Sequence, residues 1–191
     1  MQSESCDVLI VGGGPGGSSC AWGLQDSGLD VLILDQATFP RDKVCAGWIT
    51  PAVTDLLNLD LSDYQKSHVL QPITRFRTGI IGGAAVQTEF TQTVSYGIRR
   101  CEFDEYLLSR CGARTRLGEK FQSLERTENG WLVNGSLQAK VIVGAGGHFC
   151  PVARWLNPEK RSEHSVVLAQ ETEFQLTPEQ LKVCRVQPER P

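Results

Sequence analysis

A glycine cluster stands between two apolar runs near the start of the chain, in the stretch CDVLIVGGGPGGSSCAWGLQDSGLDVLILDQ at residues 6–36. The runs at 7–11 and 30–36 are rich in Val, Leu and Ile, which is typical of strands buried in a parallel sheet. Pro15 suits the first turn of a helix that we expect to extend to about Leu24 and to end before Gly28. The pattern therefore predicts a strand–helix–strand unit of the usual length, about 30 residues.

Three glycines of the cluster, Gly12, Gly14 and Gly17, fit the spacing G-x-G-x-x-G. In dinucleotide-binding proteins the first allows a tight turn, the second lets the backbone approach a pyrophosphate, and the third allows close packing of helix and strand. The N-terminus of the following helix offers N–H groups to the phosphates. Asp35 ends the second strand about 20 residues further on, where an acid binds ribose hydroxyls and disfavours a 2′-phosphate. These residues predict a site for FAD or NAD rather than NADP, and a purely structural glycine turn is the alternative.

Composition excludes several other classes of protein. The chain has 191 residues and a net charge of −3, without the basic excess that nucleic-acid-binding proteins carry. It has no run of about 18 apolar residues to span a membrane, and its first residues lack the basic region of a signal peptide. We therefore expect no nucleic acid as a partner and a cytoplasmic location.

The cysteines and histidines indicate neither a disulfide framework nor a metal site. Seven cysteines are present, without a C-x-x-C pair, and the three histidines show no ligand spacing. An odd number of scattered cysteines is typical of reduced thiols in the cytosol.

The pattern of apolar and polar residues changes along the chain. We expect a loop at 37–50 and a short helix from Pro51, whereas residues 72–98 alternate apolar and polar side chains as antiparallel strands do. A helix is expected at 101–111. Asn-Gly pairs then indicate two hairpins before a buried strand at 139–147, followed by a strand at 165–176 and a helix from Pro178.

The predicted fold class is α/β. A Rossmann-like FAD-binding domain with a parallel sheet is interleaved with part of an antiparallel-sheet substrate domain. We assign residues 1–64 and 99–159 to the first domain, and residues 65–98 and 160–191 to the second.

Four stretches in order resemble the geranylgeranyl-reductase branch of the FAD-dependent oxidoreductases, which is itself similar to the para-hydroxybenzoate-hydroxylase type of flavoprotein. They are residues 7–35, FPRDKVCAGWITP at 39–51, YGIRRCEFDEYLL at 96–108 and VIVGAGGHFCPVAR at 141–154. The resemblance extends from about residue 5 to residue 175. It implies FAD as the cofactor.

The resemblance also implies a set of site residues. The expected FAD-binding residues are Gly12, Gly14, Pro15, Gly17, Asp35, Gln36, Arg41, Arg100, Gly146 and Arg154. The residues expected closest to the flavin are Lys43, Cys45, Gly47 and Trp48, and no catalytic group is assigned. Several have a plain alternative: Arg41 and Lys43 as solvated loop charges, Arg100 as a surface residue near a helix start, Cys45 as a small buried apolar residue, and Trp48 as an ordinary packed aromatic side chain.

The chain departs from the family pattern at two places. Gly146 stands where related flavoproteins have the Asp of a G-A-D-G motif, so we expect altered handling of NAD(P)H and keep a structural turn as the alternative. No Gly-Asp dipeptide occurs, although such flavoproteins carry a later G-D-A motif. We therefore expect the N-terminal part of a longer flavoprotein, with FAD held weakly or not at all.

Three functions are consistent with these residues. The first is reduction of C=C bonds in an isoprenoid or similar hydrophobic small molecule by hydride transfer from reduced flavin. The second is a flavin-dependent monooxygenase or halogenase, and the third is a non-catalytic FAD- or NAD-binding fragment. NAD(P)H or a separate electron donor is the expected reductant, and a lipid-like substrate would bring the protein into peripheral contact with a membrane.

Overall fold

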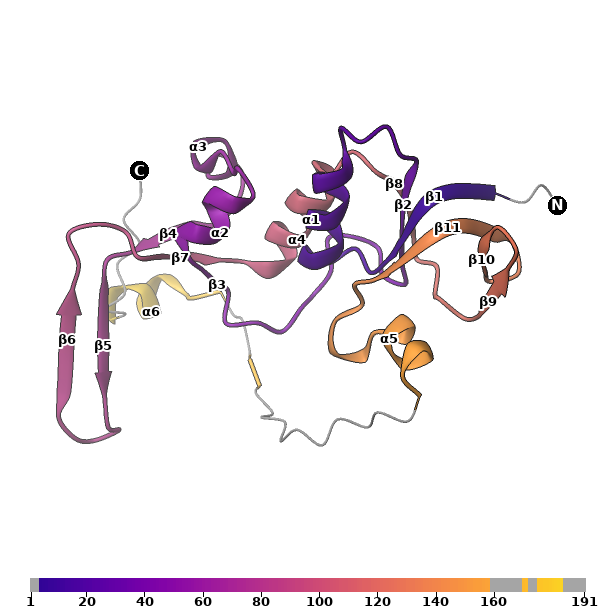
Figure 1. Cartoon of the computed structure of the whole chain (residues 1–191). Coiled ribbons are helices and arrows are strands. Elements are labelled where there is room, and N and C mark those ends of the chain that lie inside the picture. Colours follow the sequence, from indigo (N-terminus) through magenta and orange to yellow (C-terminus); the bar gives the residue numbers. More distant parts are fainter. Residues whose placement is uncertain (1–3, 159–169, 172–174, 184–191) are drawn as a thin grey trace. The chain divides into compact units, whose positions relative to one another are not determined.

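The computed structural model describes residues 4–158, 170–171 and 175–183, which belong to two units (Figure 1). Unit 1 comprises Met1–Asp42 and Phe103–Val166, and unit 2 comprises Lys43–Glu102 and Val167–Pro191. Most of the strand expected at 165–176 lies outside the described residues. The two domains expected from the sequence stay a prediction.

Unit 1 is built on a six-stranded sheet in the order β8-β2-β1-β11-β10-β9. The strands β8, β2, β1 and β11 are parallel neighbours, and β9, β10 and β11 form an antiparallel meander. This sheet confirms the predicted α/β fold class. Its strands are β1 (Glu4–Val11), β2 (Val31–Asp35), β8 (Arg114–Leu117), β9 (Leu124–Thr127), β10 (Gly130–Val133) and β11 (Leu137–Gly144).

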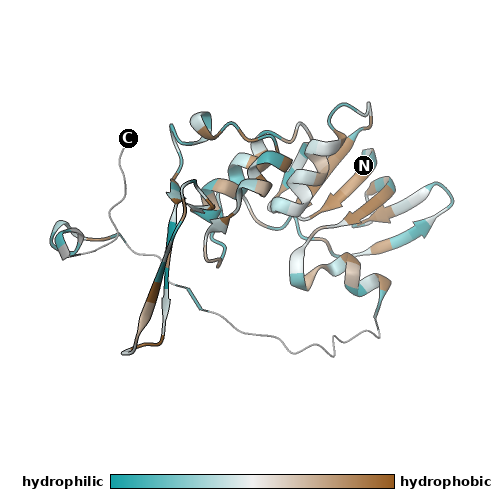
Figure 2. Cartoon of the chain, turned by 60° about the vertical axis from the view of Figure 1, so that its left-hand side comes forward, coloured by the Kyte–Doolittle hydropathy of each residue, from teal (hydrophilic) through white to brown (hydrophobic). Residues whose placement is uncertain are grey.

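The central strands β1 and β2 are buried on both faces. Leu9, Ile10 and Ile33 have at most 1% of their surface exposed, and Figure 2 shows the hydrophobic colouring along the middle of this sheet. Strands buried on both faces read as continuous apolar runs, which is why both were recognisable in the sequence. The strand β8 was not, because its alternating Arg114 and Arg116 are typical of a charged sheet edge.

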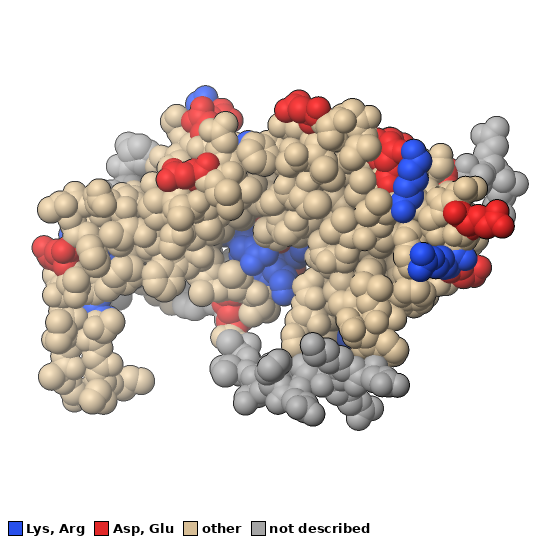
Figure 3. All heavy atoms as spheres, in the orientation of Figure 1, with Lys and Arg blue, Asp and Glu red and all other residues tan. Residues whose placement is uncertain are grey.

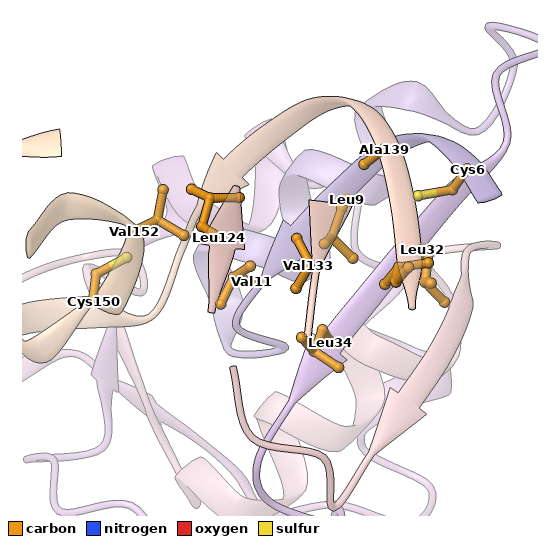
Figure 4. Packing of buried hydrophobic residues seen from close by; sticks show 11 residues of the cluster. Cys6, Leu9, Val11, Leu32, Leu34, Leu124, Val133, Ala139, Cys150 and Val152 are labelled. Atoms are coloured by element: carbon orange, nitrogen blue, oxygen red, sulfur yellow. The ribbon is translucent and has the colours of Figure 1, made fainter. Parts of the chain in front are cut away.

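Two clusters of buried side chains cover the two faces of the sheet. On one face Leu9, Leu32 and Leu34 pack against residues of the meander and against Val152 (Figure 4). On the other face Ile10 and Ile33 belong to a cluster that includes side chains of the helical segments. The helices and helical turn of this unit are α1 (Pro15–Leu24), α4 (Arg100–Ser109), whose residues from Phe103 on belong to unit 1, the 3₁₀ turn η1 (Gly147–Phe149) and α5 (Pro151–Leu156).

The strand β11 is less buried than the sequence predicts. It pairs with β1 along residues 137–144, but β10 pairs only with residues 137–139. Beyond that point Val141 has 51% of its surface exposed. The prediction of a buried strand is therefore wrong for the second half of β11, because the antiparallel neighbour ends there.

Unit 2 contains two small antiparallel sheets. One has the order β3-β7-β4, and the other is the hairpin of β5 and β6. Antiparallel strands between residues 72 and 98 are therefore confirmed, whereas the expected loop at 37–50 contains the short strand β3. The elements are β3 (Trp48–Ile49), α2 (Pro51–Leu56), α3 (Leu61–Tyr64), β4 (Leu70–Ile73), β5 (Arg75–Gly79), β6 (Ala85–Glu89), β7 (Ser95–Ile98) and α6 (Pro178–Val183).

A network of ion pairs lies at the start of the parallel strands. The Arg114 guanidinium pairs with Asp30 at 2.7 Å and also with Glu4, which in turn pairs with Arg116. Figure 3 shows acidic and basic side chains close together on the surface near the N-terminus. Within the described ranges no helix is long and apolar enough to cross a membrane, and no group of residues there could hold a metal ion.

Candidate functional site

The glycine turn lies where three parallel strands end. The Gly12 N–H donates to the carbonyl oxygen of Leu34 in β2 at 2.8 Å, and the Ala145 N–H donates to that of Val11 in β1 at 2.8 Å. The turn therefore joins the carboxyl ends of β1, β2 and β11. In open parallel sheets ligands bind at this edge.

Two glycines of the turn are required by close approaches of the backbone. Gly12 has a φ of +117°, and a Cβ there would lie 2.5 Å from the Ala145 carbonyl oxygen. A Cβ at Gly17 would overlap the carbonyl oxygen of Gly12. A side chain at either position would push the turn apart. The tight packing of the turn therefore requires glycine at these two positions of the sequence pattern.

The N-terminus of α1 is open to an anion. Gly14 is the N-cap in an extended conformation, Pro15 occupies the first helical position, and the first turn has neither a capping side chain nor an acidic residue. The buried Ser18 hydroxyl donates to the Gly13 carbonyl oxygen at 2.9 Å and fixes the turn on the helix. The N–H groups and the positive end of the helix dipole can therefore receive a phosphate.

Asp35 lies beside the turn at the end of β2. Its Oδ2 accepts from the Gly13 N–H at 2.6 Å, and its Oδ1 accepts from the Ala37 N–H at 2.8 Å. A carboxylate has about four acceptor positions, so each oxygen retains capacity for a further donor. This arrangement suits the two hydroxyls of a ribose. The neighbouring Gln36 is exposed.

Arg41 is not the freely solvated loop charge of the alternative interpretation. Its Nη2 lies 3.3 Å from Oδ2 of Asp104, a residue of α4 with no exposed surface, and the Arg41 side chain itself is 20% exposed. The guanidinium also stacks over the Phe39 ring, 4.8 Å from its centroid. The sequence shows Asp104 only as part of the stretch at 96–108 and does not predict its pairing with Arg41. Its signal was an acid that shares one face of the helix, at spacings of three and four residues, with the buried Leu107 and Leu108.

The segment after β11 closes the turn from the other side. A Cβ at Gly12 would lie 2.8 Å from the Gly146 N, so the two glycines are neighbours. A Cβ at Gly146 would itself lie 3.1 Å from the Cα of Cys150, which leaves little room for an Asp at this position. Arg154 is exposed on α5 and lies over the Phe149 ring, 5.5 Å from its centroid.

The residues expected near a flavin form a second group, in unit 2. Gly47 has a φ of +62°, and its carbonyl oxygen accepts from the Ile98 N–H at 2.8 Å, which ties the loop to β7. Lys43 is exposed, and the 55% exposed Trp48 contacts the Phe76 ring at a centroid distance of 5.5 Å.

Cys45 in the same loop has a modified acidity. Burial raises the pKa of its thiol, but hydrogen bonds from the Gly47 backbone and from Arg100 lower it by more, so that the pKa lies below its usual value. The Cys45 N–H donates to the Glu171 carboxylate. The thiol is therefore half-buried beside a cation, an environment that favours a reactive thiolate.

Comparison with known proteins identifies the relatives of this chain. Residues 10–49 match the family described as an NAD(P)-binding Rossmann-like domain. A menaquinone reductase of Mycobacterium tuberculosis is 35% identical over 147 residues, and a geranylgeranyl diphosphate reductase of Rhodobacter capsulatus is 30% identical over 156 residues. Each alignment covers 74% of this chain. These matches confirm the resemblance to the geranylgeranyl-reductase-like FAD-dependent oxidoreductases.

The chain spans 36% of the length of the menaquinone reductase and 37% of that of the geranylgeranyl diphosphate reductase. Among solved structures, a single-substitution mutant of the halogenase PltM in complex with FAD superposes with a TM-score of 0.63 at 22% identity, over 79% of this chain and 36% of that one. This likeness shows that the fold is shared with another class of FAD protein.

FAD is the cofactor of this geranylgeranyl-reductase-like family, and the residues of unit 1 fit its adenosine diphosphate half. Gly14, which has no side chain, lies at the N-terminus of α1, where phosphates bind. Asp35 presents acceptors for the ribose, and Arg41 offers a cation beside the turn. No acidic side chain caps α1 to repel the diphosphate.

Proposed function

We propose that the chain provides the adenosine-diphosphate-binding part of an FAD-dependent reductase that acts on C=C bonds of an isoprenoid or similar hydrophobic molecule. The observation that carries the proposal is the glycine turn at the ends of β1, β2 and β11, with Asp35 and Arg41 beside it. The name of the Rhodobacter capsulatus relative supports this substrate class, because geranylgeranyl is an isoprenoid chain.

When bound, FAD supplies the redox chemistry: its reduced form delivers a hydride, and a proton completes reduction of the double bond. The residues of this chain bind and orient the nucleotide. The turn and α1 hold the phosphates, and Asp35 holds the ribose. Cys45 and Arg100 form a separate thiol–guanidinium pair that can hold a proton, and we propose them as groups of the flavin region. We further propose NAD(P)H or another electron donor as the reductant.

The nucleotide-binding part of the proposal is tested by titrating the whole chain with FAD and with ADP, following the quenching of flavin fluorescence and the heat of binding. We expect ADP to displace FAD, because both use the same turn. Failure of both ligands to bind at millimolar concentration would contradict the proposal. Saturable ADP binding with little gain from the flavin half would agree with the sequence-based expectation of weak FAD retention.

The reductase part is tested by incubating the chain with FAD, dithionite and geranylgeranyl diphosphate without oxygen. A mass gain of two hydrogens for each reduced double bond is expected. A second candidate, a monooxygenase or halogenase, is favoured by the shared fold with PltM. This second candidate predicts instead a product that has gained an oxygen atom or a halogen atom when oxygen and halide are admitted. Nucleotide binding without turnover in either assay would indicate a binding module.

A further inference from the structure

The Nη2 atom of Arg41 occupies a position defined by two separate parts of unit 1. It lies 3.3 Å from Oδ2 of Asp104 in α4, and it would lie 3.2 Å from a Cβ at Gly14, the N-cap of α1. The guanidinium carbon of Arg41 lies over the Phe39 ring. The same nitrogen is thus paired with a buried acid and placed beside the backbone that opens the anion-binding helix.

An arginine side chain is long, and fixing it costs conformational entropy. A ligand that had to order Arg41 by itself would bind more weakly for that reason, whereas a guanidinium that is already fixed makes its contacts at lower cost. Asp104 has no exposed surface, so its carboxylate is a rigid anchor rather than a mobile surface partner. The ring of Phe39 restricts the guanidinium further without neutralising its charge.

We propose that Asp104 is a positioning residue for diphosphate recognition: together with Phe39 it holds the Arg41 guanidinium beside Gly14, so that Arg41 donates to a diphosphate bound at the N-terminus of α1. The inference rests on the proposed function, because it assigns a role within the same nucleotide site. Arg41 has five N–H donors, so the contact with Asp104 leaves others for phosphate oxygens.

Two roles for Asp104 make opposite predictions. If Asp104 positions Arg41, its replacement by Asn weakens diphosphate binding, because the guanidinium loses its anchor. If Asp104 only neutralises Arg41, the same replacement frees a positive charge and strengthens diphosphate binding. Adenosine, which lacks phosphate, is unaffected in both cases and serves as the internal reference.

The experiment measures the dissociation constants of ADP and adenosine by calorimetry for the wild-type chain and for Asp104→Asn, Arg41→Gln, the double variant and Phe39→Leu. We expect Arg41→Gln to weaken ADP binding by about 10- to 100-fold, the range for a hydrogen bond to a charged group. Asp104→Asn should weaken ADP binding by roughly tenfold, and the double variant should equal Arg41→Gln alone. Adenosine binding should stay within about twofold throughout.

Arg41→Lys is the conservative variant, and we expect it to restore only part of the ADP affinity, because an ammonium lacks the planar fork of the guanidinium. Phe39→Leu keeps the charge pair and reports on positioning even if Asp104→Asn lowers the melting temperature. It should weaken ADP binding selectively.

Unchanged or tighter ADP binding by Asp104→Asn, or additive losses in the double variant, would overturn the inference and leave the nucleotide site in place. Equal loss of ADP and adenosine in Phe39→Leu would also overturn it. A wild-type chain that binds neither ligand would overturn the proposed function, and the inference with it.

Discussion

The carboxylate of Asp35 accepts the Gly13 N–H at 2.6 Å, so the acid at the end of β2 is tied directly to the turn at the end of β1. The second oxygen is tied to Ala37 at 2.8 Å. The acid is therefore oriented before any ligand arrives. Its free acceptor positions are held beside the glycine turn.

This arrangement predicts a ribose-specific effect of Asp35→Asn. The wild-type chain should bind ADP more tightly than 2′-deoxy-ADP, because Asp35 accepts from the ribose hydroxyls, and the variant should lose most of this preference. Each lost hydrogen bond to the carboxylate corresponds to about 1.5–3 kcal/mol. Calorimetry with both nucleotides measures the difference. Asp42→Asn, at an exposed position of the following loop, is the matched control and should keep the preference. A preference that survives in Asp35→Asn would exclude Asp35 as the ribose ligand.

Adjacent glycines of α1 offer a sharp comparison of stability. Gly17→Ala should destabilise the chain by about 2–4 kcal/mol, because the new Cβ would overlap the Gly12 carbonyl oxygen. Gly16→Ala meets no atom within 4 Å and should be neutral, or stabilising by up to about 1 kcal/mol through helix propensity. Urea denaturation of both variants measures the free energy of unfolding. Equal effects of the two substitutions would show that the turn is looser than the structure indicates.

The thiols of Cys45 and Cys6 should titrate far apart. Hydrogen bonds from Gly47 and Arg100 outweigh burial and lower the pKa of Cys45, whereas burial raises the pKa of Cys6 to about 11. We expect iodoacetamide to modify Cys45 at a lower pH than an unfolded cysteine, and Cys6 only in strong alkali. Peptide mass spectrometry after labelling at stepped pH resolves the two sites.

The lowered pKa of Cys45 also makes the free energy of unfolding depend on pH. Because the folded pKa of Cys45 lies below the unfolded value, the thiolate stabilises the fold above the unfolded pKa. This contribution is lost as the pH falls through the folded pKa.

Arg100→Gln should raise the labelling pH of Cys45 and leave that of Cys6 unchanged. If the Cys45 profile does not move, Arg100 is not the cause of the shift.

Two isoleucines distinguish the buried sheet from the exposed hairpin. Ile33 of β2 has no exposed surface, and Ile33→Ala should cost about 2–5 kcal/mol. Ile81, at the tip between β5 and β6, is fully exposed, and Ile81→Ala should change the free energy of unfolding by less than about 0.5 kcal/mol. Thermal or urea unfolding compares them. A large loss for Ile81→Ala would show that the hairpin tip is covered in solution.

Local sequence patterns were sufficient for the elements that form from neighbouring residues. The helix α1 begins at Pro15 and ends at Leu24 as predicted, and the two Asn-Gly pairs lie at the turns of the meander. Such signals are readable because turn residues and apolar runs act within a few positions of the chain. The strands β3 and β8 were missed, since one is two residues long and the other alternates Arg with smaller side chains.

The sequence by itself determined the strand–glycine–helix–strand unit, and with it the prediction of a dinucleotide site, because the glycine spacing and the acid at the end of the second strand are local requirements of that turn. Only the tertiary structure decided that Arg41 pairs with Asp104 and lies beside Gly14, and that Gly12 packs against the segment after β11. These contacts join residues that are far apart in the chain. Their partners are chosen by sheet order and helix packing, which no local pattern encodes.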